Sequence, residues 1–268
     1  MTQAKSLNIQ ITGSGQPALL FVHGFGCSLD DWRAQVEALS GQFTCITLDL
    51  PGHGSSPLPA AATMVELANA VNTAKEACGA QEIILIGHSL GCKVIREAYS
   101  QSPKNVMGMV LIEGAFYSGE AEQLVKLASG LIDQEGFTSY ASRHFEEMFV
   151  ESSDEDQKKR VLARLPLMDT TFGRNLYLEA VRWDPARSLD TLRQMEVPAL
   201  VLQTTYHDGA LRKRQPLSLG MSTPFMDVVR ELVKDSDALV IPGAGHFPMF
   251  EAPEVINHEL RSFALRVA

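Results

Sequence analysis

The feature that most constrains this chain is the segment 87–91, which reads Gly-His-Ser-Leu-Gly. It directly follows an apolar run at 83–86 and leads into a pattern with helical spacing at 90–100. A short apolar run of this kind predicts a buried strand, so the serine would lie at a sharp strand-to-helix turn. Side chains on the two glycines would collide with neighbouring backbone at such a turn. The segment therefore predicts a strand–turn–helix unit that exposes Ser89 above a sheet.

Short apolar runs alternate with longer amphipathic stretches along most of the chain. This alternation is typical of a mostly parallel sheet covered by helices, and it predicts the α/β class with a doubly wound sheet. The runs at 83–86 and 109–112 are apolar on both faces, so we expect them in the middle of the sheet. Apolar residues at helical spacing predict a last helix at 253–266. The predicted strands are 7–12, 18–22, 43–48, 82–86, 107–112, 198–203 and 237–241.

Residues 114–190 interrupt the alternation, because they contain several helical patterns and no convincing strand. The chain has 268 residues and 45% apolar composition, which suffices for one full core with an insertion. We therefore expect a core formed by 1–113 and 191–268, which carries an inserted helical lid at 114–190.

Two helices can be predicted within the lid. One is amphipathic and carries Leu124, Leu127, Ala128 and Leu131 on one face. Another would begin with a capping box formed by Ser152 and Glu155. The charged run 154–160 places acids in the first turn and bases after them, so we interpret it as a solvated helix start.

Composition disfavours several classes of partner. The formal net charge of −9 repels phosphate backbones and anionic membranes, so we expect no nucleic acid partner. The compact basic group 212–214 is interpreted as a solvated surface. No apolar run approaches the roughly 20 residues that span a bilayer, and residues 1–6 lack the apolar stretch of a signal peptide. We expect a cytoplasmic protein without membrane insertion that acts on a small-molecule substrate.

The four cysteines are scattered without a spacing suited to zinc, so neither a metal site nor a redox motif is expected. No phosphate-binding glycine loop is visible either. The sequence thus predicts chemistry that needs no metal and no cofactor.

A serine nucleophile needs a base, because an unassisted hydroxyl reacts poorly near neutral pH. His246 closes the segment 242–246, Pro-Gly-Ala-Gly-His, which follows the predicted strand 237–241. We predict that it is the base. The other six histidines lie in glycine-rich loops, in the lid, beside an acid candidate or in the last helix: His23, His53, His88, His144, His207 and His258.

A second glycine-rich segment, 23–26, reads His-Gly-Phe-Gly and follows the predicted strand 18–22. On its own it is equally consistent with an ordinary glycine turn. Beside the serine turn, it favours an oxyanion hole in which the backbone amides of Phe25 and Leu90 donate to the reacting oxygen. Leu90 suits this role because it would begin the helix after Ser89.

Together these segments resemble the α/β-hydrolase fold family, in particular its small, lid-bearing, esterase-like members. The resemblance runs from about Ser6 to the C-terminus and includes 49–56, Asp-Leu-Pro-Gly-His-Gly-Ser-Ser, and Gly245-His246 followed by 251–254. It implies a triad of Ser89, an acid and His246. Relatives that act as haloalkane dehalogenases or epoxide hydrolases use aspartate at the nucleophile position, so these two activities are set aside.

The resemblance leaves two candidates for the acid. In the family an acid usually follows the strand after the lid, about nine residues beyond a proline such as Pro198, and Asp208 lies one residue past that position. Some relatives instead take the acid from the end of the sixth strand, where this chain has Glu113; the alternative for Glu113 is a structural carboxylate. We favour Asp208. The stretch 209–223 looks like an insert and is interpreted as a surface loop.

We therefore predict a serine hydrolase that cleaves an ester-type bond of a small apolar substrate through an acyl-enzyme, as a carboxylesterase or lactonase. Alternatives on the same fold are a cofactor-free C–C hydrolase, perhydrolase or dioxygenase, or a ligand sensor with slow turnover. Aromatic lid residues are the candidates for substrate contacts, namely Phe116, Tyr117, Phe149 and Trp183.

Overall fold

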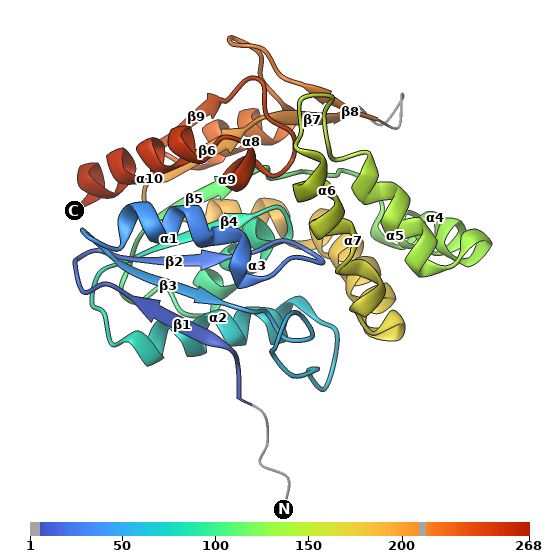
Figure 1. Cartoon of the computed structure of the whole chain (residues 1–268), viewed down its shortest axis with the longest axis horizontal. Coiled ribbons are helices and arrows are strands. Elements are labelled where there is room, and N and C mark those ends of the chain that lie inside the picture. Colours follow the sequence, from blue (N-terminus) through green and yellow to red (C-terminus); the bar gives the residue numbers. More distant parts are fainter. Residues whose placement is uncertain (1–5, 209–212) are drawn as a thin grey trace, which may run out of the picture.

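The computed structural model describes residues 6–208 and 213–268. Its main element is a seven-stranded sheet with the order β1-β3-β2-β4-β5-β6-β9 (Figure 1). All neighbouring strands pair in parallel except β1, which is antiparallel to β3. The strands are β1 Ile9–Thr12, β2 Ala18–Val22, β3 Thr44–Leu48, β4 Ile83–His88, β5 Val106–Ile112, β6 Ala199–Gln203 and β9 Ser236–Val240.

Each of these strands overlaps a predicted one, and β4 is the central strand with β5 beside it. Both faces of β4 are covered: Ile83 and Leu85 pack on one side, while Ile84 and Ile86 pack on the other. This explains the uninterrupted apolar run, because a strand buried on both faces cannot alternate with polar residues.

Helices cover both faces of the sheet. On one face lie α2 Met64–Cys78, α3 Leu90–Gln101 and α8 Pro224–Leu232. On the other lie α1 Arg33–Leu39 and α10 Pro253–Val267, while the short elements η1 Leu29–Trp32 and α9 Pro248–Glu251 adjoin them. The predicted helices at 90–100 and 253–266 are confirmed by α3 and α10.

An inserted helical region separates β5 from β6 and lies to one side of the sheet (Figure 1). The expected helix with Leu124 and Leu131 is α4. The last helix of the insert, α7, continues beyond the predicted boundary at 190 and packs its final turns against α3. The helices are α4 Ala121–Glu135, α5 Phe137–Glu146, α6 Glu155–Leu162, η2 Leu165–Leu167 and α7 Thr170–Arg193.

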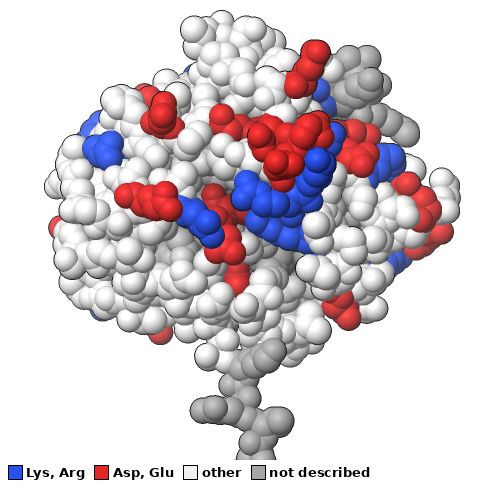
Figure 2. Space-filling model, viewed as in Figure 1, with Lys and Arg blue, Asp and Glu red and all other residues white. Residues whose placement is uncertain are grey.

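The predicted capping box at Ser152 is wrong. Asp154 caps α6 and accepts a hydrogen bond from the Gln157 amide at 2.8 Å, whereas the Ser152 hydroxyl donates to the Gly243 carbonyl at 3.3 Å. A carboxylate three residues before that amide is an equally good cap and also suits the helix dipole. Figure 2 shows acidic and basic side chains side by side over this region, as expected for a solvated helix.

The stretch 209–223, predicted as a surface loop, contains the second strand of a small hairpin. Strand β7, Thr205–Asp208, pairs antiparallel with β8, Lys213–Pro216. The hairpin starts directly after β6 and the turn at Thr204, beside the carboxyl end of the sheet. In the part of the chain that is described, no helix is long and apolar enough to cross a membrane.

Candidate active site

Ser89 lies between β4 and α3 in a strained conformation, with φ 52° and ψ −113°. A positive φ is unfavourable for a residue with a side chain, so the surrounding contacts must hold it. The Ser89 amide donates to the Ile112 carbonyl of β5 at 2.9 Å. A Cβ on Gly87 would lie 2.6 Å from the Gly91 backbone, and a Cβ on Gly91 would lie 2.2 Å from the Val22 carbonyl. Both glycines are required by this close packing.

The loop after β2 lies directly against the serine turn. A Cβ on Gly24 would be 3.2 Å from Ser89 Cβ and 3.0 Å from His88 Nδ1. Leu90 is the first residue of α3, and Ser89 precedes it as the N-cap. Gly24, the residue before Phe25, and Leu90 therefore both adjoin Ser89.

His246 lies in the loop after β9, and it is almost fully buried. Its backbone amide donates to the Met148 carbonyl at 2.9 Å, and its carbonyl accepts a hydrogen bond from His88 Nε2 at 2.7 Å. The ring of His88, the residue next to Ser89, is 4.8 Å from the ring of His246. These contacts bring His246 to the serine turn, although 157 residues separate His246 from Ser89 in the sequence (246 − 89).

Glu113 follows β5 and also has a positive φ, 54°. Its Oε2 accepts a hydrogen bond from His246 Nδ1 at 2.8 Å. The same carboxylate accepts from the amides of Thr204 at 2.6 Å and Thr205 at 3.0 Å, both through Oε1, and from the Thr205 hydroxyl through Oε2. An ionised carboxylate can only accept, so the proton of the imidazole resides on Nδ1 and Nε2 is left as an acceptor. His246 Nε2 has no hydrogen-bond partner among the described residues.

Glu113, the alternative acid, is the carboxylate that this geometry places beside His246, and the preference for Asp208 stays a prediction. Among the described side chains, the carboxylate within hydrogen-bond distance of His246 is that of Glu113. Asp208 is the last residue of β7, where its backbone pairs with Lys213, and its side chain lies outside the described part of the structure. At the turn after β6, the backbone amides of Thr204 and Thr205 donate hydrogen bonds to Glu113. The chain then continues into the hairpin.

The contact of Arg214 with the site was not predicted, because the basic group 212–214 was interpreted as a solvated surface. The guanidinium Nη1 donates to Glu113 Oε2 at 3.2 Å and to Thr205 Oγ1 at 2.9 Å, and only 10% of the side chain is exposed. The sole signal in the sequence was a basic residue within the apparent insert. That signal does not distinguish a surface arginine from one that enters the site.

The pKa values of the Glu113–His246 pair are shifted downward. Burial alone would raise the pKa of Glu113, but the hydrogen bond and charge of His246, together with Arg214 and Thr205, lower it to about 2. Burial is also the main reason why the pKa of His246 falls to about 4; Arg214 lowers it further and Glu113 opposes both effects. Glu113 is therefore ionised and His246 neutral at neutral pH, which is the state that a general base needs.

Three other histidines near the site support the loops. His23 Nε2 accepts from the Leu50 amide at 3.0 Å, and Nδ1 donates to the Gly24 carbonyl at 2.7 Å. His53 Nδ1 lies 3.1 Å from the Pro51 carbonyl. His88 bonds the carbonyl of His246, and these polar contacts fix the loops around Ser89.

The four aromatic candidates for substrate contacts lie in different surroundings. Phe149 stacks on Phe247, the residue after His246, with ring centroids 5.0 Å apart. Phe116 packs partly buried on the core, and Tyr117 is 43% exposed. Trp183 is buried against α3, where its Nε1 donates to Glu97 Oε2 at 2.8 Å. The ring nitrogen of Trp183 therefore takes part in the contact between α7 and α3.

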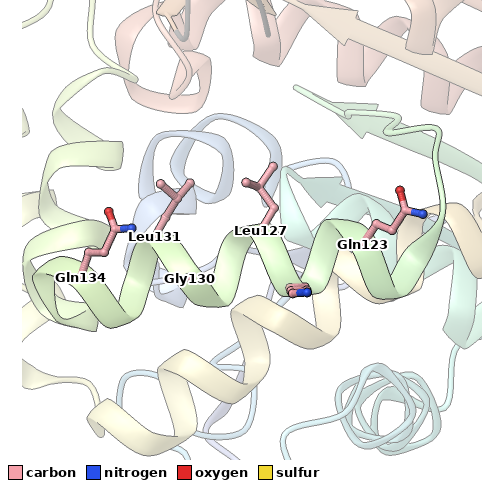
Figure 3. Close-up of a pocket in the computed structure, with 6 residues that line it drawn as sticks. Gln123, Leu127, Gly130, Leu131 and Gln134 are labelled. Carbon is pink, nitrogen blue, oxygen red and sulfur yellow. The ribbon is translucent and has the colours of Figure 1, made fainter.

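The insert also carries a groove of about 380 Å³ on α4 (Figure 3). Its lining residues recur at helical spacing on one exposed face of α4, and neither Ser89 nor His246 is among them. We therefore interpret it as helix surface and not as part of the active site. The residues that line the groove are Gln123, Lys126, Leu127, Gly130, Leu131 and Gln134. No cluster of three or more His, Cys, Asp or Glu side chains is placed to bind a metal ion within 6–208 and 213–268.

Among known proteins, some relatives match only part of this chain and others match nearly all of it. The chain is 35% identical over 132 residues to the dihydrolipoyllysine-residue acetyltransferase component of the acetoin cleaving system of Cupriavidus necator, a match that covers 49% of this chain. The match spans about a third of that relative, 33% of its length. The chain is also 26% identical to the pimeloyl-[acyl-carrier protein] methyl ester esterase of Cronobacter sakazakii, over 97% of both chains.

Solved structures agree on the fold. A thermophilic esterase from Thermogutta terrifontis superposes with a TM-score of 0.72 and 24% sequence identity, covering 97% of this chain and 93% of that one. The sequence model of the alpha/beta hydrolase fold matches residues 17–253, which include Ser89, Glu113 and His246. The chain therefore belongs to the α/β hydrolase fold family.

Proposed function

We propose that this chain is a serine hydrolase that cleaves carboxylic esters through an acyl-enzyme on Ser89. The observation that carries the proposal is the contact between His246 Nδ1 and Glu113 Oε2 beside a strained serine turn. This contact fixes the tautomer of His246 so that the unpartnered Nε2 can accept a proton.

In the first step, His246 Nε2 accepts the proton of the Ser89 hydroxyl as Ser89 Oγ attacks the ester carbonyl carbon. Glu113 remains ionised and stabilises the imidazolium that forms. The amides of Phe25 and Leu90 donate hydrogen bonds to the oxyanion, supported by the N-terminus of α3. The imidazolium then protonates the alkoxide oxygen, and the alcohol leaves.

In the second step, His246 takes a proton from a water molecule, which attacks the carbonyl carbon of the acyl-enzyme. The imidazolium then returns this proton to Ser89 Oγ as the bond between Oγ and the acyl carbon breaks, and the acid is released. The same residues act in both steps because the two tetrahedral intermediates have the same charge distribution. The proposal requires no metal or organic cofactor for this sequence of reactions.

Two observations favour an ester with an apolar group. The relative from Cronobacter sakazakii, similar over its whole length, is a methyl ester esterase. In this chain the rings of Phe145, Phe149 and Phe250 surround Phe247, with centroids 5.0 to 6.2 Å from it, next to His246. An apolar acyl or alkyl group would gain free energy by contact with such a cluster.

The test is a panel of p-nitrophenyl esters and lactones with the wild type, Ser89→Ala and the control Ser129→Ala. Ser129 is a matched control because it lies on α4, away from the serine turn. We expect Ser89→Ala to fold normally and to lose several orders of magnitude in kcat. Equal rates in wild type and Ser89→Ala, with no fluorophosphonate labelling of Ser89, would overturn the proposal.

A further inference from the structure

The guanidinium of Arg214 forms a buried contact with the acid that bonds His246. Arg214 Nη1 donates to Glu113 Oε2 at 3.2 Å, and only 10% of the Arg214 side chain is exposed. Glu113 is fully buried at its side chain. A buried ion pair costs desolvation on both partners, so a contact of this kind is not a routine surface pairing.

The hairpin that carries Arg214 is anchored on the same carboxylate. Thr205, the first residue of β7, donates its amide and its hydroxyl to Glu113 and accepts from Arg214 Nη1 at 2.9 Å. The turn residue before it, Thr204, donates its hydroxyl to the Gly245 carbonyl at 2.6 Å, next to His246. The hairpin therefore contacts both the acid and the loop of the base.

We propose that Arg214 is a positioning residue, an inference that rests on the proposed function. Its guanidinium fixes the Glu113 carboxylate against His246 and disfavours the imidazolium in the site before substrate binds. Arg214 acts through Glu113, with which it shares Oε2. A cation beside the pair offsets the charge of Glu113, so that His246 takes a proton less readily before substrate is bound. The hydrolase could then work at a lower pH than an unassisted histidine would permit.

The charge effect agrees with the pKa shifts around the pair. Arg214 lowers the pKa of His246, second only to burial, and it also helps to lower that of Glu113. The other groups that face the pair are His88 from β4, His144 from α5, Glu251 from α9 and His207, which pairs with Arg214 across the hairpin.

Two of these groups have lowered pKa values of their own. Burial lowers the pKa of His144 to about 3 and that of His88 well below its usual value. Burial raises the pKa of Glu251, which bonds the Phe247 amide at 3.3 Å. A variant of Glu251, Glu251→Gln, is therefore included to separate its titration from that of His246.

The experiment measures kcat and kcat/KM against pH for the wild type, Arg214→Met, Arg214→Lys, Arg266→Met and Glu251→Gln. Arg266 is a matched control, because its guanidinium also pairs with a carboxylate, that of Asp237 at 2.7 Å, but on the surface. We expect Arg214→Met to move the acid limb of kcat/KM upward by about one pH unit, with KM unchanged. Its kcat on the neutral plateau should fall about tenfold, since Glu113 is held less firmly. In Arg214→Lys the acid limb should shift less than in Arg214→Met, because lysine retains the positive charge. Arg266→Met should leave both the acid limb and kcat unchanged.

A second readout does not depend on turnover. NMR of histidine labelled with ¹³C at Cε1, in the Ser89→Ala background, follows the titration of His246 directly, with His246→Gln used for assignment. We expect the same upward shift in Arg214→Met. An unchanged limb and an unchanged titration in folded Arg214→Met would overturn the positioning role. An inactive wild type that fluorophosphonate does not label would instead overturn the proposed function.

Discussion

Glu113 Oε2 lies 2.8 Å from His246 Nδ1, although 133 residues separate the two in the sequence. Glu113 directly follows β5 and His246 lies in the loop after β9, so the two residues share neither a local motif nor a secondary-structure element. The contact exists because parallel strands bring their carboxyl ends to one edge of the sheet, where Ser89 also emerges from β4.

Glu113→Gln should lower kcat by about a thousandfold or more, with little change in KM. Glutamine preserves the shape, but an amide nitrogen facing His246 would force the imidazole proton onto Nε2 and remove the base. The matched control is Asp208→Asn, for which we expect a rate near that of the wild type. Steady-state kinetics of both variants decide the matter, and a greater loss in Asp208→Asn would transfer the role to Asp208.

Gly24→Ala should damage the site without unfolding the protein. The added methyl group would lie 3.0 Å from His88 Nδ1 and 3.2 Å from Ser89 Cβ, so the loop of Phe25 must shift by a few tenths of an ångström. Since donor geometry governs oxyanion stabilisation, we expect a loss in kcat of about tenfold or more.

The control for this variant is Gly130→Ala on α4, where an added Cβ meets nothing within 4 Å. It should retain full activity and stabilise the chain by about 0.5 to 1 kcal/mol, because alanine favours helix. Thermal melts and ester hydrolysis of both variants provide the comparison. Wild-type kinetics in Gly24→Ala would mean that this loop does not form the oxyanion hole.

Stability should fall as the pH is lowered from about 6.5 to about 4. Burial lowers the pKa of His23 to about 4, of His53 to about 3 and of His246 to about 4, against the usual 6.5. In this window these histidines bind more protons in the unfolded state than in the folded state, so the free energy of unfolding rises with pH. Glu113, with its pKa lowered to about 2, adds a further loss below its usual 4.5.

Urea unfolding at several pH values between 4 and 7 measures this slope. In His53→Gln the slope should be shallower, because one buried histidine no longer titrates differently in the two states. The exposed His258 provides the control, and His258→Gln should leave the slope unchanged. A stability that is independent of pH in this window would show that the buried histidines gain protons without unfolding.

Lys93→Met should destabilise the chain by about 3 kcal/mol, since it would leave a buried carboxylate unpaired. Lys93 Nζ lies 2.5 Å from Asp184 Oδ2, with side chains 10% and 0% exposed, and the pair joins α3 to α7 of the insert. The double variant Lys93→Met/Asp184→Leu should recover much of the loss. The exposed pair Lys159–Asp156 is the control, and Lys159→Met should cost less than about 1 kcal/mol. Equal costs for the two single variants would contradict the buried character of the first pair.

Local patterns in the sequence predict the strand–helix order, the central strand and the turn at Ser89. These features are local: an apolar run buried on both faces, two glycines with no room for a side chain, and a helix that follows at once. His246 was likewise identified by its position after a strand near the C-terminus. For such features, neighbouring residues contain nearly all the physical information.

The contact between Glu113 and His246 depends on the path of the chain in three dimensions. Counting residues from Pro198 favoured Asp208, because sequence spacing assumes that the chain after β6 follows one path. The turn at Thr204 and the hairpin beyond it change that path, so that the amides of Thr204 and Thr205 and the guanidinium of Arg214 converge on Glu113. A buried carboxylate is stabilised by the donors that surround it in space, and their separation along the chain does not reveal them.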